Sequence, residues 1–417
     1  MSTSDISGEE SLSGAIGDEA KPANMNRQFL KRLGISVAII AVVFWGNVSW
    51  LLGSYFHGSE YMYRAQMLVV DYDGSLVGQA LLAAVDDANG PVNNPTYVVA
   101  SAREYTLQEV KHAVFIGQFW GAIYASADAT AQLNATLAGT NTSVYDVDAV
   151  YMLFGNSARY TAFYPSVVLD NLEAIANAAA AYFRQTLAGV YWEDVLTRNI
   201  SQAQLGTFLR PLGYTYVDTS YGSFTFGDRT TFNTLMIVVV VLAQFFFLLA
   251  LNNLSKACGR FAAVSTWDYF KWRLPLSLGW ACFMGICLTS WQMIFREGYP
   301  INARLFWALW ILYTVFSTIV FDVLDIITAF VPQQYIPYCM FTWMITNVSS
   351  AGSPVELSNA FYHISYFFPA HSMWLAEQHI WSQGGAYPLS LSLPILAAWL
   401  VVVKVCTIFT VKPRRGY

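Results

Sequence analysis

Long apolar stretches that are almost free of charge are the feature that most constrains this chain. A helix needs roughly 20 apolar residues to cross a bilayer, and in hydrocarbon it must satisfy its backbone polar groups internally. Six stretches fit this requirement: residues 33–52, 232–251, 274–295, 305–321, 326–348 and 389–411. The sequence therefore predicts a membrane α-helical protein with six transmembrane helices. Pro332 and Pro337 interrupt the fifth stretch, and Lys404 lies in the sixth.

The composition agrees with a membrane protein and excludes other classes. Hydrophobic residues make up 55% of the chain and charged residues only 12%, about half the share that soluble proteins carry. The net charge is -5 and there is no basic block, so nucleic acid is excluded as a partner. The five cysteines are too scattered for a zinc site or a disulfide framework.

Lys and Arg residues in the short flanks predict the orientation, because cytoplasmic flanks are enriched in them. With the N-terminus in the cytoplasm, eleven fall in cytoplasmic flanks and only Arg296 and Arg304 in short segments on the other side. We therefore expect a multi-pass protein, N- and C-termini cytoplasmic, with residues 33–52 as a signal anchor. Residues 1–30 are expected to form a disordered cytoplasmic tail, and residues 53–231 an extracytoplasmic domain.

The region between the first two apolar stretches alternates short apolar runs with helical periodicity. Such alternation predicts an α/β domain whose sheet is covered by helices. Residues 198–228, rich in Tyr, Gly and Thr, are expected to return to the membrane as strands and turns. The expected strands are residues 65–74, 96–101, 119–126 and 148–155.

Three candidate glycosylation sites lie in this domain. Asn134, Asn141 and Asn199 each begin an N-x-[ST] triplet. They agree with a lumenal or extracellular face, although the triplet is short enough to occur by chance.

Asp71 and Asp73 in VVDYDG form the one acidic pair of this domain that could carry chemistry. Alternate strand residues share a face, so the two carboxylates could form a metal or acid/base site. Acidic residues at the end of a strand more often cap the next helix, and we favour that interpretation. No catalytic motif accompanies them, so we do not expect an enzyme, and no cofactor is expected.

Three stretches carry a family resemblance: MLVVDYDGSLVGQALLAAV, LQEVKHAVFIGQFWGAIYASADATAQLNATLAG and NVSSAGSPVELSNAFYHISYFFPAHSMWLAEQHIWSQGG. With the order of the apolar stretches, the chain resembles the fungal nitrosoguanidine-resistance membrane protein family. That family is related to the bacterial phage-infection protein family and to type-2 ABC exporter permeases. The resemblance implies export of small toxic compounds, or resistance to them, or lipid movement, at the plasma membrane. By analogy with type-2 permeases it also implies a homodimer.

The energy source of such an exporter constrains the candidate residues. The sequence contains no P-loop, so ATP-driven transport would need a separate ATPase subunit. Proton coupling would need a titratable group within the membrane, and the candidates are Asp322, Asp325 and Lys404. We favour a tight cytoplasmic turn closed by the two aspartates. An Asp–Lys ion pair between helices and a proton relay are the alternatives.

Other polar residues lie within the apolar stretches or after the fifth one. Gln244, Ser290 and Gln292 are candidates for a transport path, although polar residues of this kind more often bond neighbouring helices. Residues 351–388 are expected to form short helices dipping into the outer membrane interface. Within them, ordinary polar anchoring is favoured over zinc binding for four residues: His363, His371, Glu377 and His379.

These observations leave two main hypotheses for function. The first is a permease-like membrane protein that exports small toxic compounds or moves lipids. The alternative is a non-transporting adaptor whose extracytoplasmic domain binds partners or lipids. A membrane enzyme that uses Asp71 or Asp73 is a third.

Overall fold

The computed structural model describes residues 22–140, 145–197, 201–263 and 265–410. Contacts divide the chain into two units, Met1–Ser49 and Trp50–Tyr417. The described part of the first unit belongs to α1 (Pro22–Gly53), which contains the apolar stretch of residues 33–52. The expected disordered tail is therefore wrong for residues 22–30, which are helical, and its remainder lies outside the described residues. All further elements lie in the second unit.

An α/β lobe forms the first part of the second unit. Its five strands lie in the order β2-β1-β3-β4-β5, and only the β3–β4 pair is antiparallel. Four of these strands fall within the residues expected to be strands. The strands are β1 (Gln66–Asp71), β2 (Thr96–Ala100), β3 (Gly121–Ala125), β4 (Tyr151–Gly155) and β5 (Tyr214–Asp218).

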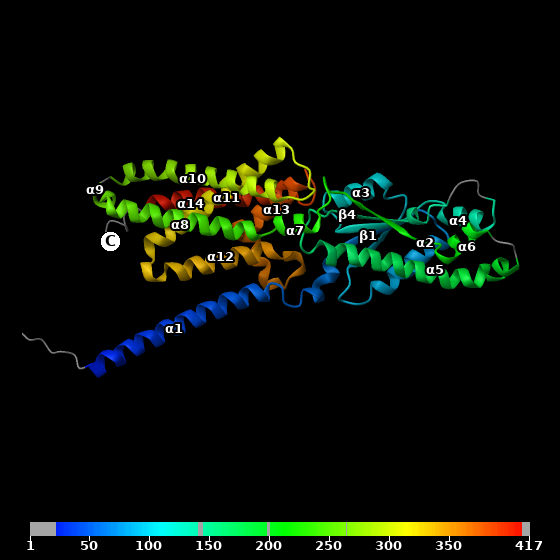
Figure 1. Cartoon of the computed structure of the whole chain (residues 1–417), viewed down its shortest axis with the longest axis horizontal. Helices are drawn as coiled ribbons and strands as arrows, with labels where there is room; N and C mark the ends of the chain where they lie inside the picture. The colour runs from blue at the N-terminus through cyan, green and yellow to red at the C-terminus, as the bar shows by residue number, and fades with distance from the viewer. Residues whose placement is uncertain (1–21, 141–144, 198–200, 264, 411–417) are drawn as a thin grey trace, which may run out of the picture. The chain divides into compact units, whose positions relative to one another are not determined.

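Helices cover both faces of the sheet, which explains the uninterrupted apolar run of β1. Val69 packs with residues of α2 and α5, which lie side by side (Figure 1). Its neighbours Leu68 and Val70 pack on the opposite face with Val110 of α3. A strand buried on both faces loses its polar alternation. The helices of the lobe are α2 (Leu76–Ala88), α3 (Leu107–Phe115), α4 (Ala129–Leu137), α5 (Asp170–Thr197) and α6 (Gln202–Leu209).

The return to the helical part differs from the expected strands and turns. Residues 198–228 contain α6 and the start of α7 (Phe226–Thr231) as well as β5. Both helices begin with a capping box, at Ser201 and Thr225, in which side chains satisfy the free backbone amides of the first turn. The short helical turns are η1 (Gly58–Arg64), η2 (Val147–Ala149), η3 (Pro165–Leu169), η4 (Gln333–Tyr335), η5 (Val355–Leu357) and η6 (Ala360–Phe367).

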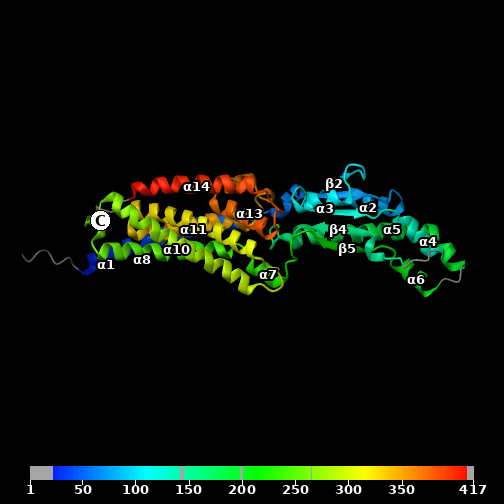
Figure 2. The ribbon, with the colours of Figure 1, turned by 90° about the horizontal axis from the view of Figure 1, so that it is seen from above.

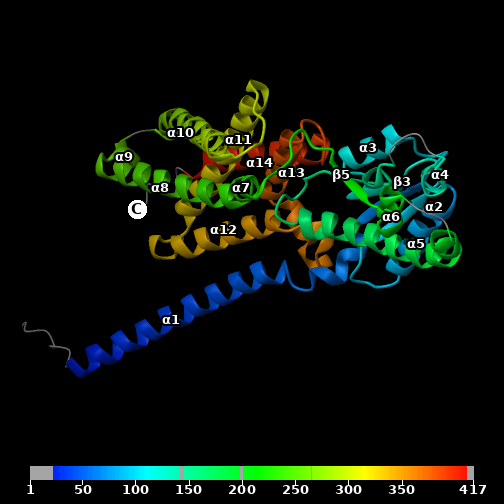
Figure 3. The same cartoon turned by 45° about the vertical axis from the view of Figure 1, so that its right-hand side comes forward.

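A helical bundle forms the rest of the second unit. Four of its helices, α8, α10, α11 and α14, run alongside one another (Figure 2), and α12 lies beside α8 (Figure 3). The central helix is α11, which contacts α8, α10, α13 and α14. The bounds are α8 (Leu235–Ala257), α9 (Arg260–Ala263), α10 (Thr266–Phe295), α11 (Ala303–Phe330), α12 (Ile336–Gly352), α13 (Pro369–Trp381) and α14 (Leu389–Phe409).

Five helical segments of the described chain are long and apolar enough to cross a membrane. The protein is therefore a multi-pass, membrane α-helical protein. Of the five, the segment around α11 has the largest buried share, so it lies inside the bundle and the others present more apolar surface outward. The segments are Arg27–Arg64, Phe226–Ala257, Trp267–Phe295, Ala303–Phe330 and Leu389–Phe409.

The fifth expected helix, residues 326–348, is wrong as a single element. The first residues of this stretch are the last residues of α11. The helix is interrupted at Val331 and Pro332, and α12 begins at Ile336. Proline disfavours the helical conformation of the residue before it, so Pro332 ends α11. Pro337 is instead tolerated because it lies in the first turn of α12. Helix α12 has 17 residues, near the lower limit for crossing.

The expected interfacial character of residues 351–388 is also only partly right. Exposed aromatic side chains such as Phe361 and Phe367 do occur on η6. However, α13 is largely enclosed by protein, with every residue from 369 to 378 buried. Because an apolar stretch can face lipid or protein, composition alone could not distinguish these two environments.

Candidate functional site

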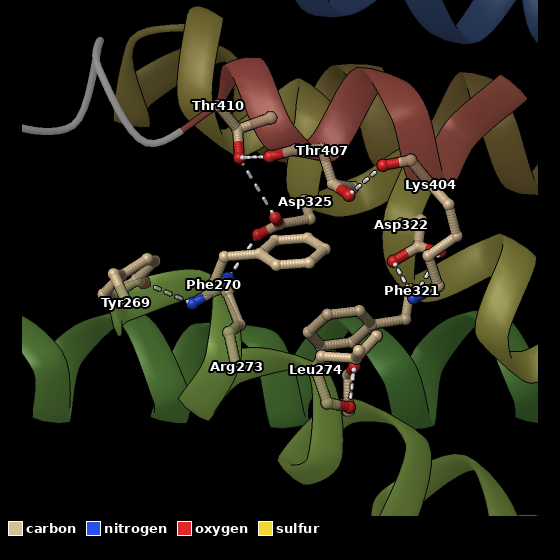
Figure 4. Close-up of a pocket in the computed structure, with 11 residues that line it drawn as sticks. Tyr269, Phe270, Arg273, Leu274, Phe321, Asp322, Asp325, Lys404, Thr407 and Thr410 are labelled. Atoms are coloured by element: carbon tan, nitrogen blue, oxygen red, sulfur yellow. Dashed lines mark hydrogen bonds and ion pairs between the residues drawn. The ribbon is translucent and has the colours of Figure 1, made fainter. Parts of the chain in front are cut away.

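A cluster of four charged side chains lies inside the bundle. Asp322 and Asp325 are three residues apart on α11, so their carboxylates lie on neighbouring positions of one helix face. They face α10 on one side and α14 on the other (Figure 4). Both aspartates lie within α11, which continues to Phe330, and neither closes a turn. The favoured turn interpretation is therefore wrong.

Lys404 of α14 forms an ion pair with Asp322. Its Nζ lies 2.9 Å from a carboxylate oxygen, and the Asp322 side chain is only 3% exposed whereas that of Lys404 is 26% exposed. The long, flexible side chain of lysine can reach a carboxylate on a neighbouring helix while part of the side chain stays exposed. This pair connects α11 to α14.

Arg273 of α10 forms the second ion pair, with Asp325. Its guanidinium also donates to the Tyr269 hydroxyl at 2.6 Å and to Oδ1 of Asn252 on α8 at 2.9 Å. Thr410, the C-cap residue of α14, donates to the other oxygen of Asp325 at 3.5 Å. Asp325 therefore connects α11 to α10 and α14 directly, and to α8 through the arginine.

The cluster is electrically balanced, with two carboxylates and two cations. Burying an ion pair costs desolvation energy, and removing one partner leaves an uncompensated charge at a cost of about 3–5 kcal/mol. The cavity between these residues has a volume of about 10 Å³, enough for about one water molecule. In the described arrangement this cavity has no room for a larger molecule.

Arg273 is the residue of this cluster that sequence reasoning missed. It was assigned to a cytoplasmic flank because the apolar stretch begins at residue 274. Helix α10 begins earlier, at Thr266, so Arg273 lies two turns inside it. The sequence does contain a signal for this earlier helix start, because a serine followed three residues later by an acidic residue is typical of a helix N-terminus. In the structure the Ser265 side chain accepts from the Asp268 amide.

The three candidates for a transport path do not form one path. Gln244 is fully buried on α8, and its amide has no hydrogen-bond partner among the described residues. Ser290 is half-buried on α10. Gln292, also on α10, donates to the Tyr313 hydroxyl at 2.6 Å and to Glu377 at 2.8 Å. In the part of the chain that the structure covers, no hydrogen bond joins these three candidates.

The acidic pair of the lobe, Asp71 and Asp73, is used for capping. Asp73 accepts from the backbone amide of Thr130 at 2.8 Å, at the start of α4, and from that of Gly78 at 3.3 Å, at the start of α2. Asp71 accepts from the amides of Asp73 and Gly74. The pair lies at the carboxyl ends of β1 and β3, where open sheets bind ligands. Here the carboxylate of Asp73 occupies that place.

Two of the three histidines of residues 351–388 bond to the backbone, and the third, His363, is exposed on η6. His371 Nδ1 lies 2.8 Å from the carbonyl oxygen of Ser350, and His379 Nδ1 lies 2.7 Å from that of Tyr387. No group of three or more His, Cys, Asp or Glu residues that could hold a metal ion occurs within the described ranges. Among the glycosylation candidates, Asn134 lies in α4, while Asn141 and Asn199 fall outside the described residues.

A buried arginine joins the lobe to the bundle. Arg159, in the loop after β4, donates through Nε to the Tyr387 hydroxyl at 3.0 Å and stacks on the ring of Trp120 at 3.7 Å. The Tyr387 hydroxyl in turn donates to Glu356 at 2.9 Å. Next to it, the Tyr160 amide donates to Gln378 of α13 at 2.8 Å. These contacts attach the loop after β4 to residues before, within and after α13, namely Glu356, Gln378 and Tyr387.

Comparison with known proteins assigns a family. Residues 36–405 match a family model described as "Protein of unknown function (DUF3533)". No curated protein and no solved structure matches the chain. The match begins within the first apolar helix and ends in α14, so it covers the lobe, the bundle and the charged cluster. The chain therefore belongs to the DUF3533 family.

Proposed function

We propose that this protein is a membrane transporter that exports small toxic amphipathic compounds or moves lipids. The observation that carries the proposal is the pair of ion pairs, Asp322–Lys404 and Asp325–Arg273, inside helices that can cross a membrane. Ionisable residues are costly in that environment and are typically found on substrate or ion pathways. The resemblance to nitrosoguanidine-resistance proteins and type-2 ABC permeases supports the same function.

The proposed arrangement has six crossings, in which the 17-residue α12 is the fifth. Both termini lie in the cytoplasm and the α/β lobe lies outside it, at the plasma membrane. The excess of Lys and Arg in the assigned cytoplasmic flanks supports this orientation. A homodimer, and a separate ATPase subunit if ATP drives transport, are proposed by analogy with type-2 permeases.

The ion pairs suit a gate that holds the bundle closed. Arg273 attaches α10 to α11, and Lys404 attaches α14 to α11, around a cavity with room for about one water. Opening requires the pairs to separate or to exchange partners. Exchange is feasible in principle because the two carboxylates lie within one helical turn of each other.

Reconstitution of the purified protein into liposomes tests this function. We expect the wild-type protein to move a fluorescent phospholipid or a hydrophobic cationic dye across the bilayer when ATP or a pH gradient is supplied. Asp325→Asn should change the rate, because it weakens the pair with Arg273. Asp86→Asn alters an exposed residue of α2 and should leave the rate unchanged. Equal rates with and without protein for every probe would contradict the proposal.

The small cavity also suits the second candidate, a non-transporting adaptor. A bundle whose cavity at the ion pairs has a volume of only about 10 Å³ could serve as an anchor, with the lobe binding a partner or lipids. The same liposomes discriminate the two functions, because an adaptor gives no flux under any condition. A stable stoichiometric partner in a pull-down would then favour the adaptor.

A further inference from the structure

A second buried acid lies apart from the charged cluster. Glu377 of α13 has no exposed surface. Among the described residues it forms no ion pair with any Lys, Arg or His. Helix α13 has 13 residues and is too short to cross a membrane. The carboxyl group is therefore enclosed by protein without a compensating cation.

Its two oxygens have different surroundings. Oε1 accepts from Gln292 Nε2 at 2.8 Å and from the Tyr313 hydroxyl. Oε2 has no hydrogen-bond partner within the described ranges, and neither has Oε1 of Gln292. The site thus has two unpartnered acceptors and no donor for them. A proton on Oε2 would supply the missing donor, since a protonated carboxyl donates through its O–H.

The energetics favour proton binding at this position. A buried carboxylate without a cation is costly, and such groups usually become neutral instead. Burial raises the pKa of Glu377 from 4.5 to about 7, while the hydrogen bonds from Tyr313 and Gln292 oppose that rise. Both protonation states are therefore accessible near neutral pH.

We propose that Glu377 is a proton-binding site and that its protonation and deprotonation couple movement of the bundle to a proton gradient. This inference rests on the proposed transport function and specifies its energy source. The step is a proton transfer only. Water on one side supplies the proton to a carboxylate oxygen of Glu377, and the proton returns to water on the other side.

No charged or titratable side chain on the described elements around Glu377 forms an ion pair with it. Tyr313 faces it from α11 and the neutral Gln292 from α10, while Arg296 after α10 donates to the carbonyl of Tyr299. On α13 itself, the rings of His371 and His379 bond to backbone carbonyls. Helix α12 carries no charged residue, and Lys404 of α14 pairs with Asp322.

Helix α11 connects this site to the charged cluster. Tyr313, Ser317, Phe321 and Asp325 are successive residues at a spacing of four, so they form one ridge that is inclined to the helix axis. Twelve residues separate Tyr313 from Asp325, about 18 Å along the axis. Ser317 is fully buried and its hydroxyl has no partner in the described chain. A movement of α11 caused by a change in the charge of Glu377 would therefore also move Asp325.

Infrared difference spectroscopy of the purified full-length protein in lipid nanodiscs tests the proton site directly. At low pH every Asp and Glu contributes to the carbonyl band of protonated carboxyl groups, and we expect one component of this band to disappear with a midpoint near neutrality. Glu377→Gln should remove that component, whereas Asp86→Asn, which changes an exposed acid, should retain it. A spectrum without this component, or a component that is undiminished in Glu377→Gln, would overturn the proposal.

A second variant keeps the test informative if Glu377→Gln does not fold. Tyr313→Phe keeps the acid and removes one hydrogen bond to its charged form. We therefore expect the midpoint of the band to move to higher pH. A midpoint that stays or moves to lower pH would overturn the assignment to Glu377.

Flux measurements separate the proton site from the proposed function. In liposomes that contain the wild-type protein, a pH gradient should increase the movement of the fluorescent phospholipid or the dye, and Glu377→Gln should abolish that increase. Flux that ignores the gradient would overturn the coupling. If the infrared band titrates as expected while no probe moves, the transport function fails and the proton site stands.

Discussion

The Nε of Arg159 donates a hydrogen bond of 3.0 Å to the hydroxyl of Tyr387, across 228 residues of sequence. Arg159 belongs to the α/β lobe, and Tyr387 lies between α13 and α14 of the bundle. The same guanidinium donates to the carbonyl of Gly117 at 3.2 Å and lies 3.5 Å from Glu356. A single buried side chain thus satisfies groups from both parts of the second unit.

Replacement of Arg159 should destabilise the contact between lobe and bundle. Arg159→Met leaves the acceptors it bonds without a donor, and we expect a loss of about 1–3 kcal/mol because buried acceptors are left unsatisfied. Arg210→Ala is the matched control. It breaks an ion pair with Asp148 whose two side chains are largely exposed, and such pairs contribute at most about 1 kcal/mol. Thermal unfolding in detergent measures both, and equal losses would contradict the role of Arg159.

The two partners of the Asp322–Lys404 pair should respond unequally to substitution. Lys404→Met leaves Asp322 with a side chain that is only 3% exposed, whereas Asp322→Asn leaves Lys404 with a flexible side chain that is 26% exposed. We therefore expect Lys404→Met to lower the melting temperature more. The double variant should recover part of that loss, because it removes both charges. A larger effect of Asp322→Asn alone would argue against this pair as a buried one.

The stability of the protein should fall as the pH rises from about 4.5 to about 7, because of Glu377. Its pKa is raised from 4.5 to about 7 by burial, so in this range the folded protein holds a proton that the unfolded chain releases. The free energy of unfolding then decreases with pH, by on the order of 3 kcal/mol over the whole range. Glu377→Gln should flatten this dependence. Parallel pH profiles of the two proteins would exclude Glu377 as its source.

Close packing of α10 on α11 depends on Gly285. A Cβ at Gly285 would lie 2.6 Å from the Thr314 hydroxyl and 3.1 Å from the backbone oxygen of Trp310, whereas a Cβ at Gly279 of the same helix would meet nothing within 4 Å. We expect Gly285→Val to destabilise the protein by about 1–3 kcal/mol more than Gly279→Val, because overpacking forces the helices apart. Thermal unfolding of the two variants in detergent decides, and similar melting temperatures would contradict this prediction.

The proposed orientation can be tested with the chain's own cysteines. Cys258 is exposed at the end of α8, on the proposed cytoplasmic side. With the other four cysteines replaced by Ser, a membrane-impermeant maleimide should label it only after the cells are permeabilised. Asp86→Cys, introduced into a cysteine-free chain, should be labelled on intact cells. Labelling of Cys258 on intact cells would reverse the orientation.

The sequence predicted the elements whose pattern is local. The apolar runs around Val69 and Ile123 indicated buried strands, because residues packed on both faces of a sheet leave no polar alternation. The length of the run before Leu251 likewise indicated a spanning helix. Pro332 was recognised as an interruption of the fifth stretch, but the expected span continued through it and so divided α11 at the wrong residue.

Pairings between distant residues could not be predicted in the same way. Asp325 was a candidate, but its partner Arg273 lies 52 residues earlier on another helix, and only tertiary packing brings the two together. Glu377 was assigned to the membrane interface because its segment is apolar and broken by prolines. Its burial depends on how α13 packs against α11, α12 and α14, which residue spacing does not indicate.

The carboxylate of Asp73 has a consequence for how the lobe can work. It accepts from the first turns of both α2 and α4, so the chain supplies its own anion where related sheet architectures receive one from solution. Those amides already have an acceptor, so a phosphate or nucleotide could bind there only by displacing the side chain of Asp73. Control of this domain by such a molecule would have to act elsewhere on its surface.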